Sequence, residues 1–333
     1  MIVKAAAVQA SPVQFDLPKS IDKVARLVAE AAGNGAQLIV LPEAFLSAYP
    51  RHFTFSVGYR TESNREWYKK YVESAVKVPE DALTHDWAAT APEQAVGDDF
   101  WAFARLCAIA KEHNVYLSVG IIERSLIGST VWCCNLVFGP DGRLLSKHRK
   151  LKPTGAERMI WHEGEDLNPA RDADGAVVQG TDNMPVVSTQ IGRIGSMICW
   201  ENYMPLARYV LYKKGVELYL APTADGRTTW LPSMQHVAQE GRCFVITANQ
   251  YQEASDFPAD YPAPPNADKV WCGGGSAIVD PLGNVLAGPL WGEEGIVYAD
   301  LDMGSIHATK VDFDPVGHYS REPLLKKMLQ EMW

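Results

Sequence analysis

Two kinds of hydrophobic spacing alternate along the chain. Apolar runs with the character of β-strands occupy residues 2–10, 37–43, 115–123, 217–223 and 243–250. Between them, apolar residues recur every three or four positions, as Ile21, Val24, Leu27, Val28 and Ala31 do, which is typical of an amphipathic helix. This helical spacing covers residues 19–33, 98–114, 205–215 and 230–241. Strands and helices that alternate through one chain predict an α/β domain built in layers.

Two segments resemble each other across the chain. "VFGPDGRLL" (137–145) and "IVDPLGNVL" (278–286) share the pattern apolar-x-Pro-x-Gly-x-x-Leu, which predicts a hairpin in each. Either such hairpins recur by chance, or two similar α-β halves pack sheet against sheet. No linker-like run divides the halves, so we expect a single domain over residues 1–320 and a C-terminal tail over 321–333.

Two segments interrupt the alternation. Residues 51–97, rich in Trp, Tyr, Glu and Lys, have the character of an insertion. Residues 254–269 carry four prolines and predict a long loop that acts as a lid or an interface.

The composition excludes several classes of partner. Hydrophobic residues make up 47% of the chain and charged residues 21%, as expected for a globular protein with a large core. A net charge of −9 argues against a nucleic-acid or anionic-membrane partner, because either requires a basic patch. The longest uncharged run, residues 125–140, contains Ser, Gly, Thr and Asn and is unsuited to span a bilayer. The start has no signal-peptide pattern, so we predict a cytoplasmic protein.

Cys199, in "SMICWEN" (196–202), allows four interpretations: core thiol, disulfide partner, metal ligand or nucleophile. A core thiol is the ordinary role of a free cysteine. Six cysteines in 333 residues, two of them adjacent, do not form a disulfide framework. The chain has no Cys-x-x-Cys and no closely spaced His pair, so a metal site would have to assemble from distant residues.

Reactive side chains follow three of the predicted strands. Glu43 ends "LIVLPE", Lys150 follows "GRLLSKHRK", and Cys199 ends "RIGSMIC". Each has an ordinary alternative, as a cap, a surface cation or a core residue. Together they are complementary, because a carboxylate can deprotonate a thiol and an ammonium can stabilise an anion or protonate a nitrogen. The set therefore suits attack on a carbon atom that is bonded to nitrogen.

Three motifs resemble the nitrilase superfamily, in the same order and at compatible separations. They are "LIVLPEAFLSAYP", "KHRKLKPTGAER" and "ICWEN", and the last is similar to the nitrilase and cyanide-degrading branch. The resemblance extends from residue 2 to about residue 320. It implies a four-layer α-β-β-α sandwich, with Cys199 as nucleophile, Glu43 as general base and Lys150 stabilising the tetrahedral intermediate. It also implies homodimers or larger homo-oligomers, since members pair through outer helices and often extend into spirals.

Three further residues acquire roles through the same resemblance. Glu157, in "PTGAER", matches a second glutamate that supports the lysine and the arriving water; the alternative is an exposed acid at a helix start. Tyr49 falls where the family lines its substrate pocket, and Trp200 offers a backbone N–H beside the thiolate. The alternative for both aromatic residues is simple packing.

The activity that the resemblance implies is hydrolysis of a small-molecule nitrile to the carboxylic acid and ammonia. It requires no metal and no organic cofactor. The alternatives are a cyanide hydratase or an amidase of the same architecture and, from another class, a non-catalytic assembly protein. One segment departs from the family pattern: residues 161–166 read Trp-His-Glu-Gly-Glu-Asp where many nitrilases have Trp-Gly-x-Gly-Asp.

Overall fold

The computed structural model describes residues 1–89, 99–165, 168–171 and 177–332, and in these residues the chain forms two large sheets. The first contains β1 (Ile2–Gln9), β2 (Leu38–Val40), β3 (Val76–Lys77), β4 (Tyr116–Arg124), β5 (Val131–Phe138), β6 (Leu144–Arg149) and β16 (Gly295–Asp302). The second contains β9 (Val186–Thr189), β10 (Gly192–Ser196), β11 (Leu218–Leu220), β12 (Phe244–Thr247), β13 (Tyr251–Glu253), β14 (Val270–Val279) and β15 (Val285–Trp291). A separate pair joins β7 (Asn168–Arg171) and β8 (Val177–Asp182).

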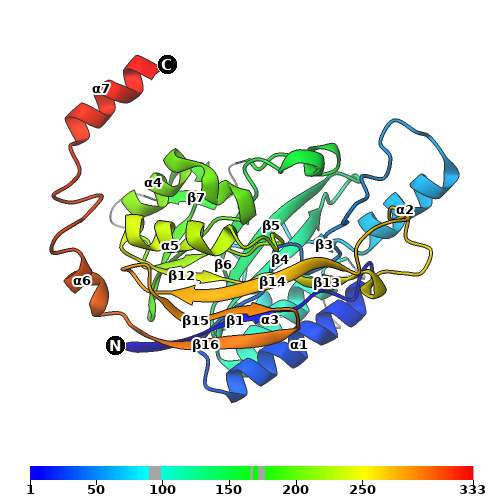
Figure 1. The fold of residues 1–333 in the computed structure, drawn as a ribbon, viewed down its shortest axis with the longest axis horizontal. Helices are drawn as coiled ribbons and strands as arrows, with labels where there is room; N and C mark the ends of the chain where they lie inside the picture. The colour runs from blue at the N-terminus through cyan, green and yellow to red at the C-terminus, as the bar shows by residue number, and fades with distance from the viewer. Residues whose placement is uncertain (90–98, 166–167, 172–176, 333) are drawn as a thin grey trace.

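Helices cover the outer face of each sheet (Figure 1). α1 (Leu17–Gly33) and α3 (Trp101–His113) pack on the first sheet, and α4 (Pro205–Lys213) and α5 (Trp230–Gly241) pack on the second. The remaining helices are α2 (Glu62–Glu73), α6 (Ser305–Thr309), α7 (Glu322–Met332) and the short 3₁₀ turns η1 (Trp87–Ala89), η3 (Gly155–Met159), η4 (Cys199–Tyr203) and η5 (Ala254–Asp256). The predicted α-β-β-α sandwich is confirmed.

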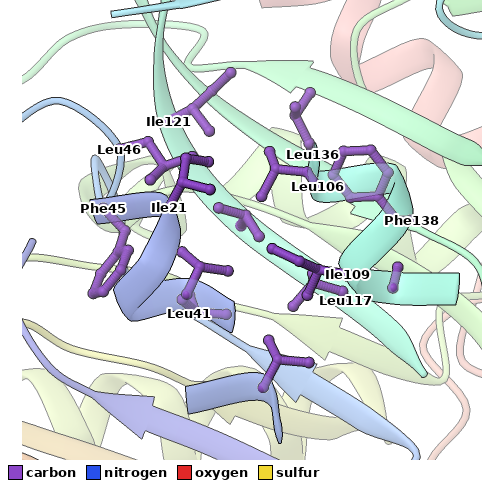
Figure 2. Packing of buried hydrophobic residues seen from close by; sticks show 14 of the residues in the cluster. Ile21, Leu41, Phe45, Leu46, Leu106, Ile109, Leu117, Ile121, Leu136 and Phe138 are labelled. Atoms are coloured by element: carbon purple, nitrogen blue, oxygen red, sulfur yellow. The ribbon is translucent and has the colours of Figure 1, made fainter. Parts of the chain in front are cut away.

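The side-chain alternation of β1 shows why the layers form. Ala5 and Ala7 belong to the apolar core between the two sheets, whereas Ala6 and Val8 belong to the core beneath α1 and α3. A strand with both faces covered is therefore a nearly continuous apolar run, as residues 5–8 of β1 are. Figure 2 shows the core beneath α1 and α3, where Ile21 of α1 and Leu106 and Ile109 of α3 lie among side chains of the first sheet.

Both predicted hairpins are present. β5 and β6 pair antiparallel around residues 139–143 in the first sheet, and β14 and β15 pair antiparallel around 280–284 in the second. Each sheet therefore holds one copy of the repeated pattern, which agrees with the interpretation of two similar halves.

The predicted insertion contains structure of its own. Residues 90–97 lie outside the described residues, but the preceding part includes α2 and β3, and β3 pairs with β4 in parallel. The segment therefore adds a strand to the first sheet rather than only interrupting the alternation. In the 254–269 loop, Phe257 and Tyr261 are buried, and the Tyr261 hydroxyl donates to the Arg51 carbonyl at 2.7 Å.

α7 stands apart from the layered body at the end of an extended segment (Figure 1). Its approach is tied to α4 by an ion pair between Lys213 and Glu322 and by a 3.2 Å hydrogen bond between Tyr209 and Ser320. No helix in the described part of the chain is long and apolar enough to cross a membrane.

Strand direction gathers the reactive residues at one edge. β2 runs parallel to β4, and β6 has the same direction because β5 is antiparallel to both β4 and β6. In the second sheet, β10, β11 and β12 are mutually parallel. The segment after β12 meets the segment after β2, since the Gln250 side chain donates to the Glu43 carbonyl at 2.6 Å. The carboxyl ends of the parallel strands in the two sheets therefore lie close together.

Candidate active site

Glu43 lies in the tight turn after β2 and is fully buried. The turn presses against β4 at Gly120, where an added Cβ would lie 2.2 Å from the Pro42 carbonyl oxygen. Only glycine allows this approach. Among the described residues, the Oε2 atom of Glu43 accepts no hydrogen bond. Burial, opposed by the charge of Lys150, raises the pKa of the Glu43 carboxyl, so this group is suited to accept a proton.

Lys150 lies between two carboxylates. Its Nζ is 2.6 Å from Glu43 Oε1 and 2.7 Å from Glu157 Oε2, and its side chain is fully buried. Although burial lowers the pKa of Lys150, the two carboxylates raise it well above its usual value. The ammonium is therefore charged at neutral pH. The interpretation as a surface cation is wrong.

Glu157 caps the η3 turn and also completes the ion-pair set. Its Oε2 accepts from the Thr154 backbone N–H at 2.6 Å, and its Oε1 accepts from the Tyr49 hydroxyl at 2.6 Å. The residue is only 7% exposed, so the alternative of an exposed acid is wrong. Three donors fix the carboxylate in one orientation.

Cys199 is the first residue of η4, at the sharp turn that follows β10. Its φ of 52° lies in the left-handed region, where a non-glycine residue is strained and often functional. Its backbone N–H donates to the Pro222 carbonyl at 2.9 Å, and its carbonyl accepts from the Asn202 side chain at 2.7 Å. Burial, and next the charge of Glu43, hold the pKa of the thiol well above its ordinary value. The resting residue is therefore a neutral thiol that needs a base.

The disulfide and metal interpretations of Cys199 find no support in the geometry. All six cysteines are free and buried. No group of three or more His, Cys, Asp and Glu side chains within the described ranges could hold a metal ion.

A buried polar network joins the nucleophile turn to the lysine loop. Glu201 accepts from the Ile198 backbone N–H at 2.6 Å and from the Leu151 backbone N–H. The His148 ring donates to Glu201 at 2.8 Å through Nε2 and contacts the Asn183 carbonyl through Nδ1. Because both neighbours of the ring are acceptors, the arrangement favours the imidazolium form of His148. Glu201 thus holds the residues before Cys199 and after Lys150 at a fixed separation.

Tyr49 and Trp200 face different surroundings. Tyr49 lines a cavity of about 350 Å³ together with Arg51, Phe53, Glu157, Ile160 and Trp161. Trp200 is 40% exposed, its indole N–H donates to Asp225 at 2.9 Å, and its ring lies under the Arg227 guanidinium. The role predicted for the Trp200 backbone N–H beside the thiolate stays a prediction.

The segment that departs from the family pattern supports the lysine. The Gly164 N–H donates to the Lys150 carbonyl at 2.8 Å, and the Trp161 ring lies 5.4 Å from Lys150 Nζ. The Trp161 indole N–H donates to the Tyr71 hydroxyl at 2.7 Å. Asp166, the last residue of the departure, lies outside the described residues.

Two residues of the site are not predicted by the sequence motifs. Thr223 follows β11, and its hydroxyl is 3.1 Å from Cys199 Sγ. Its position after a strand, beside the strand that leads to Cys199, is a signal that could have identified it. Arg51 lines the cavity and donates to Gln252 at 2.8 Å, but nothing in its sequence neighbourhood distinguishes it.

The site contains the groups that nucleophilic attack on a carbon atom requires. It combines a thiol, a buried carboxylate of raised pKa, and an ammonium held between two carboxylates. The cavity beside Glu157 and Tyr49 is large enough for a small organic molecule.

Comparison with known proteins identifies relatives of this chain. The model of the carbon-nitrogen hydrolase family matches residues 4–311. The chain is 44% identical to the bifunctional nitrilase/nitrile hydratase NIT4A of Lupinus angustifolius, over 99% of this chain and 86% of that protein. It is 43% identical to nitrilase 2 of Arabidopsis thaliana, over 99% of this chain and 89% of that protein.

Solved structures share the fold at lower identity. The crystal structure of Saccharomyces cerevisiae Nit3, a member of branch 10 of the nitrilase superfamily, superposes with a TM-score of 0.69 at 21% identity. The alignment covers 96% of this chain and 97% of that one. A carbon-nitrogen hydrolase from Helicobacter pylori G27 gives the same TM-score at 20% identity and covers 98% of each chain.

Proposed function

The chain belongs to the carbon-nitrogen hydrolase family, and on that premise we propose that it is a nitrilase that hydrolyses an organic nitrile to the carboxylic acid and ammonia through a covalent bond to Cys199. The observation that carries the proposal is the buried set in which Lys150 bridges Glu43 and Glu157 while Cys199 lies within the field of all three. Identities of 43–44% to plant nitrilases support nitriles as the substrate class.

The first step forms the bond between sulfur and carbon. The Cys199 thiol passes its proton to Glu43, and the sulfur adds to the nitrile carbon. The nitrile nitrogen becomes negatively charged as the triple bond opens, and Lys150 stabilises it or protonates it. The product is a thioimidate on Cys199. Trp200 is suited to donate its backbone N–H beside this centre.

The second half of the reaction releases ammonia and the acid. Glu43 first returns the thiol proton through Lys150, 2.6 Å away, to the nitrogen of the thioimidate, and is a carboxylate again. It then activates a water that adds to the thioimidate carbon, giving a tetrahedral carbon that bears sulfur, oxygen and nitrogen. Protonated nitrogen leaves as ammonia, and a thioester remains. A second water cleaves the thioester, which regenerates the Cys199 thiol. The sum is one nitrile and two waters converted to one acid and one ammonia, with no cofactor consumed.

Glu157 governs which bond of the tetrahedral carbon breaks. Acid forms when protonated nitrogen leaves, and amide forms when the thiolate leaves first. Two carboxylates beside Lys150 favour positive charge on the nitrogen and therefore favour acid. A bias of about 1.4 kcal/mol suffices for a tenfold preference. We expect acid as the main product and amide as a minor one.

Substitution of Glu157 by glutamine is expected to raise the amide share, because the nitrogen loses part of its stabilising field. The amide oxygen and amino group can keep the contacts to Lys150 and Tyr49, so the site keeps its shape. Chromatography of both products from one nitrile measures the ratio. An unchanged or smaller amide share in Glu157→Gln would contradict this role.

The amide is also the second candidate product. Relatives at 43–44% identity carry both activities in their names, which favours a measurable amide fraction from this chain. Ammonia release from cyanide, a simple amide and phenylacetonitrile separates a nitrilase from a cyanide hydratase or an amidase. A panel of aliphatic, arylacetic and aromatic nitriles then defines the substrate. Mostly amide from every good nitrile would favour a hydratase.

We propose that copies of this chain associate through α4. Leu206 and Val210 of this helix are 52% and 38% exposed, and an exposed apolar face of this kind marks an interface. Light scattering at micromolar concentration is expected to give a dimer or larger rather than the 36.7 kDa chain. Leu206→Glu should weaken association, whereas Ile127→Glu, on a fully exposed loop, should not. A stable, fully active monomer would overturn the proposal.

We also propose a cytoplasmic location and a single catalytic domain over residues 1–320, followed by a C-terminal tail. Six free cysteines suit a reducing compartment. The family match to residue 311 and the projecting position of α7 support the domain boundary.

A further inference from the structure

The hydroxyl of Thr223 touches the sulfur of Cys199. Thr223 Oγ1 lies 3.1 Å from Cys199 Sγ, and the Thr223 side chain is fully buried. The contact joins two neighbouring parallel strands, because Cys199 follows β10 and Thr223 follows β11. The same turn also holds the backbone of the nucleophile, since the Pro222 carbonyl accepts the Cys199 N–H.

The hydroxyl proton of Thr223 points to the sulfur. The Asp225 backbone N–H donates to Thr223 Oγ1 at 3.1 Å, so the oxygen already acts as an acceptor there. A hydroxyl carries one proton, and Cys199 Sγ is the acceptor to which it donates. The Thr223 backbone N–H donates to the Ala248 carbonyl at 2.9 Å, which fixes the residue against β12.

We propose that Thr223 is a catalytic residue that donates a hydrogen bond to the Cys199 thiolate, both when the thiolate forms for attack and when it leaves the tetrahedral carbon. The inference rests on the proposed role of Cys199 as the nucleophile. A thiolate at a buried position depends on protein donors, and a hydroxyl at 3.1 Å from the sulfur is such a donor.

Thr223 keeps its proton throughout the reaction. In the attack, the S–H proton moves to Glu43, the sulfur lone pair forms the C–S bond, and the hydrogen bond from Thr223 is strongest at the moment when the sulfur is anionic. When the tetrahedral carbon collapses to the amide, the C–S bond breaks and its electron pair returns to sulfur, so the same hydrogen bond stabilises the departing thiolate. When it collapses toward the acid, the C–N bond breaks and the sulfur stays bonded to carbon in the thioester. Thr223 therefore favours thiolate expulsion, in opposition to Glu157.

Two variants separate the hydroxyl from the rest of the side chain. Thr223→Val keeps the branched shape and removes the donor, whereas Thr223→Ser keeps the donor. Alkylation of Cys199 by iodoacetamide, followed by peptide mass spectrometry across a pH series, reports thiolate formation without any turnover. A hydrogen bond to a charged group corresponds to roughly one to two pH units. We expect the alkylation midpoint of Thr223→Val to rise by about that amount and that of Thr223→Ser to stay near the parent.

Turnover gives a second readout with a defined sign. Thr223→Val should lower kcat/KM by about 10- to 100-fold and decrease the amide share, because a less stable thiolate is a poorer leaving group. Thr247→Val is the matched control, since Thr247 is also a buried threonine but donates to the Ala221 carbonyl. It should lower the melting temperature without moving the alkylation midpoint.

The outcomes are decisive in either direction. An alkylation midpoint of Thr223→Val within 0.3 pH units (roughly 0.4 kcal/mol) of the parent, or a larger amide share, would overturn the inference. If Thr223→Val fails to fold, Thr223→Ala is measured in the same way. Failure of the parent to hydrolyse nitriles would refute the proposed function, but the alkylation series would still decide whether Thr223 stabilises the thiolate.

Discussion

Cys199→Ala is expected to abolish nitrile hydrolysis, with kcat/KM falling by a factor on the order of 10⁴ or more. The substitution removes the atom that forms the covalent bond, and nothing else in the turn can replace it. The variant should fold, because the Cys199 backbone keeps its hydrogen bonds to Pro222 and Asn202, and only the contact between the sulfur and Thr223 is lost. Ammonia release gives the activity, and a thermal melt verifies the fold.

Cys107→Ala is the matched control for this result. Cys107 is a buried thiol of α3, in the core between this helix and the first sheet. Its loss should cost stability but leave kcat/KM within a few-fold of the parent. Cys199→Ala activity within tenfold of the parent would return Cys199 to the class of core thiols.

Lys150→Arg is expected to give a folded protein whose rate is lower by a factor of ~10²–10³. Arginine keeps the charge that neutralises the two buried carboxylates. A guanidinium is nevertheless a broad planar fork, whereas the site holds a compact ammonium with both carboxylate oxygens within 2.7 Å. The donor that should meet the substrate nitrogen is thereby displaced.

Lys147→Arg, on the strand β6 that leads to Lys150, provides the comparison for Lys150→Arg. Lys147 pairs with Glu123 at 2.9 Å, away from the proposed nucleophile. Steady-state rates and thermal melts of both variants should show that only Lys150→Arg is impaired. A rate for Lys150→Arg within tenfold of the parent would contradict the proposed role.

The layered fold could be predicted because its causes are local. The strand β1 is apolar at successive positions since both of its faces are covered, and the helical spacing from Ile21 to Ala31 gives α1 one buried face. The helical spacing predicts a start at Lys19, two residues later than the structure has it. The Asp16 side chain accepts from the Lys19 N–H and caps the helix, so it begins at Leu17.

The short strand β3 could not be predicted. It has two residues, too few to carry a period, and it exists because Val76 and Lys77 meet the far end of β4. Its formation therefore depends on a tertiary contact rather than on a local pattern.

The proposed catalytic residues could be identified from strand ends and motifs, but their contacts could not. The hydrogen bond from Thr223 to Cys199 depends on the register between β10 and β11 and on the left-handed φ of Cys199. The burial of Glu157 depends on Tyr49, which is distant in the sequence. The position of the Trp200 side chain beside Asp225 likewise follows from packing between separate turns.

The covalent intermediate on Cys199 is the central claim, and acid quenching during turnover followed by peptide mass spectrometry tests it most directly. Acid preserves a thioester, so the peptide that contains Cys199 should carry the acyl group of the nitrile when the reaction is quenched while substrate remains. The mass should disappear when the substrate is exhausted, and Cys199→Ala should never acquire it. Continued release of acid and ammonia with the Cys199 peptide unmodified, or with the acyl group on another residue, would contradict the account.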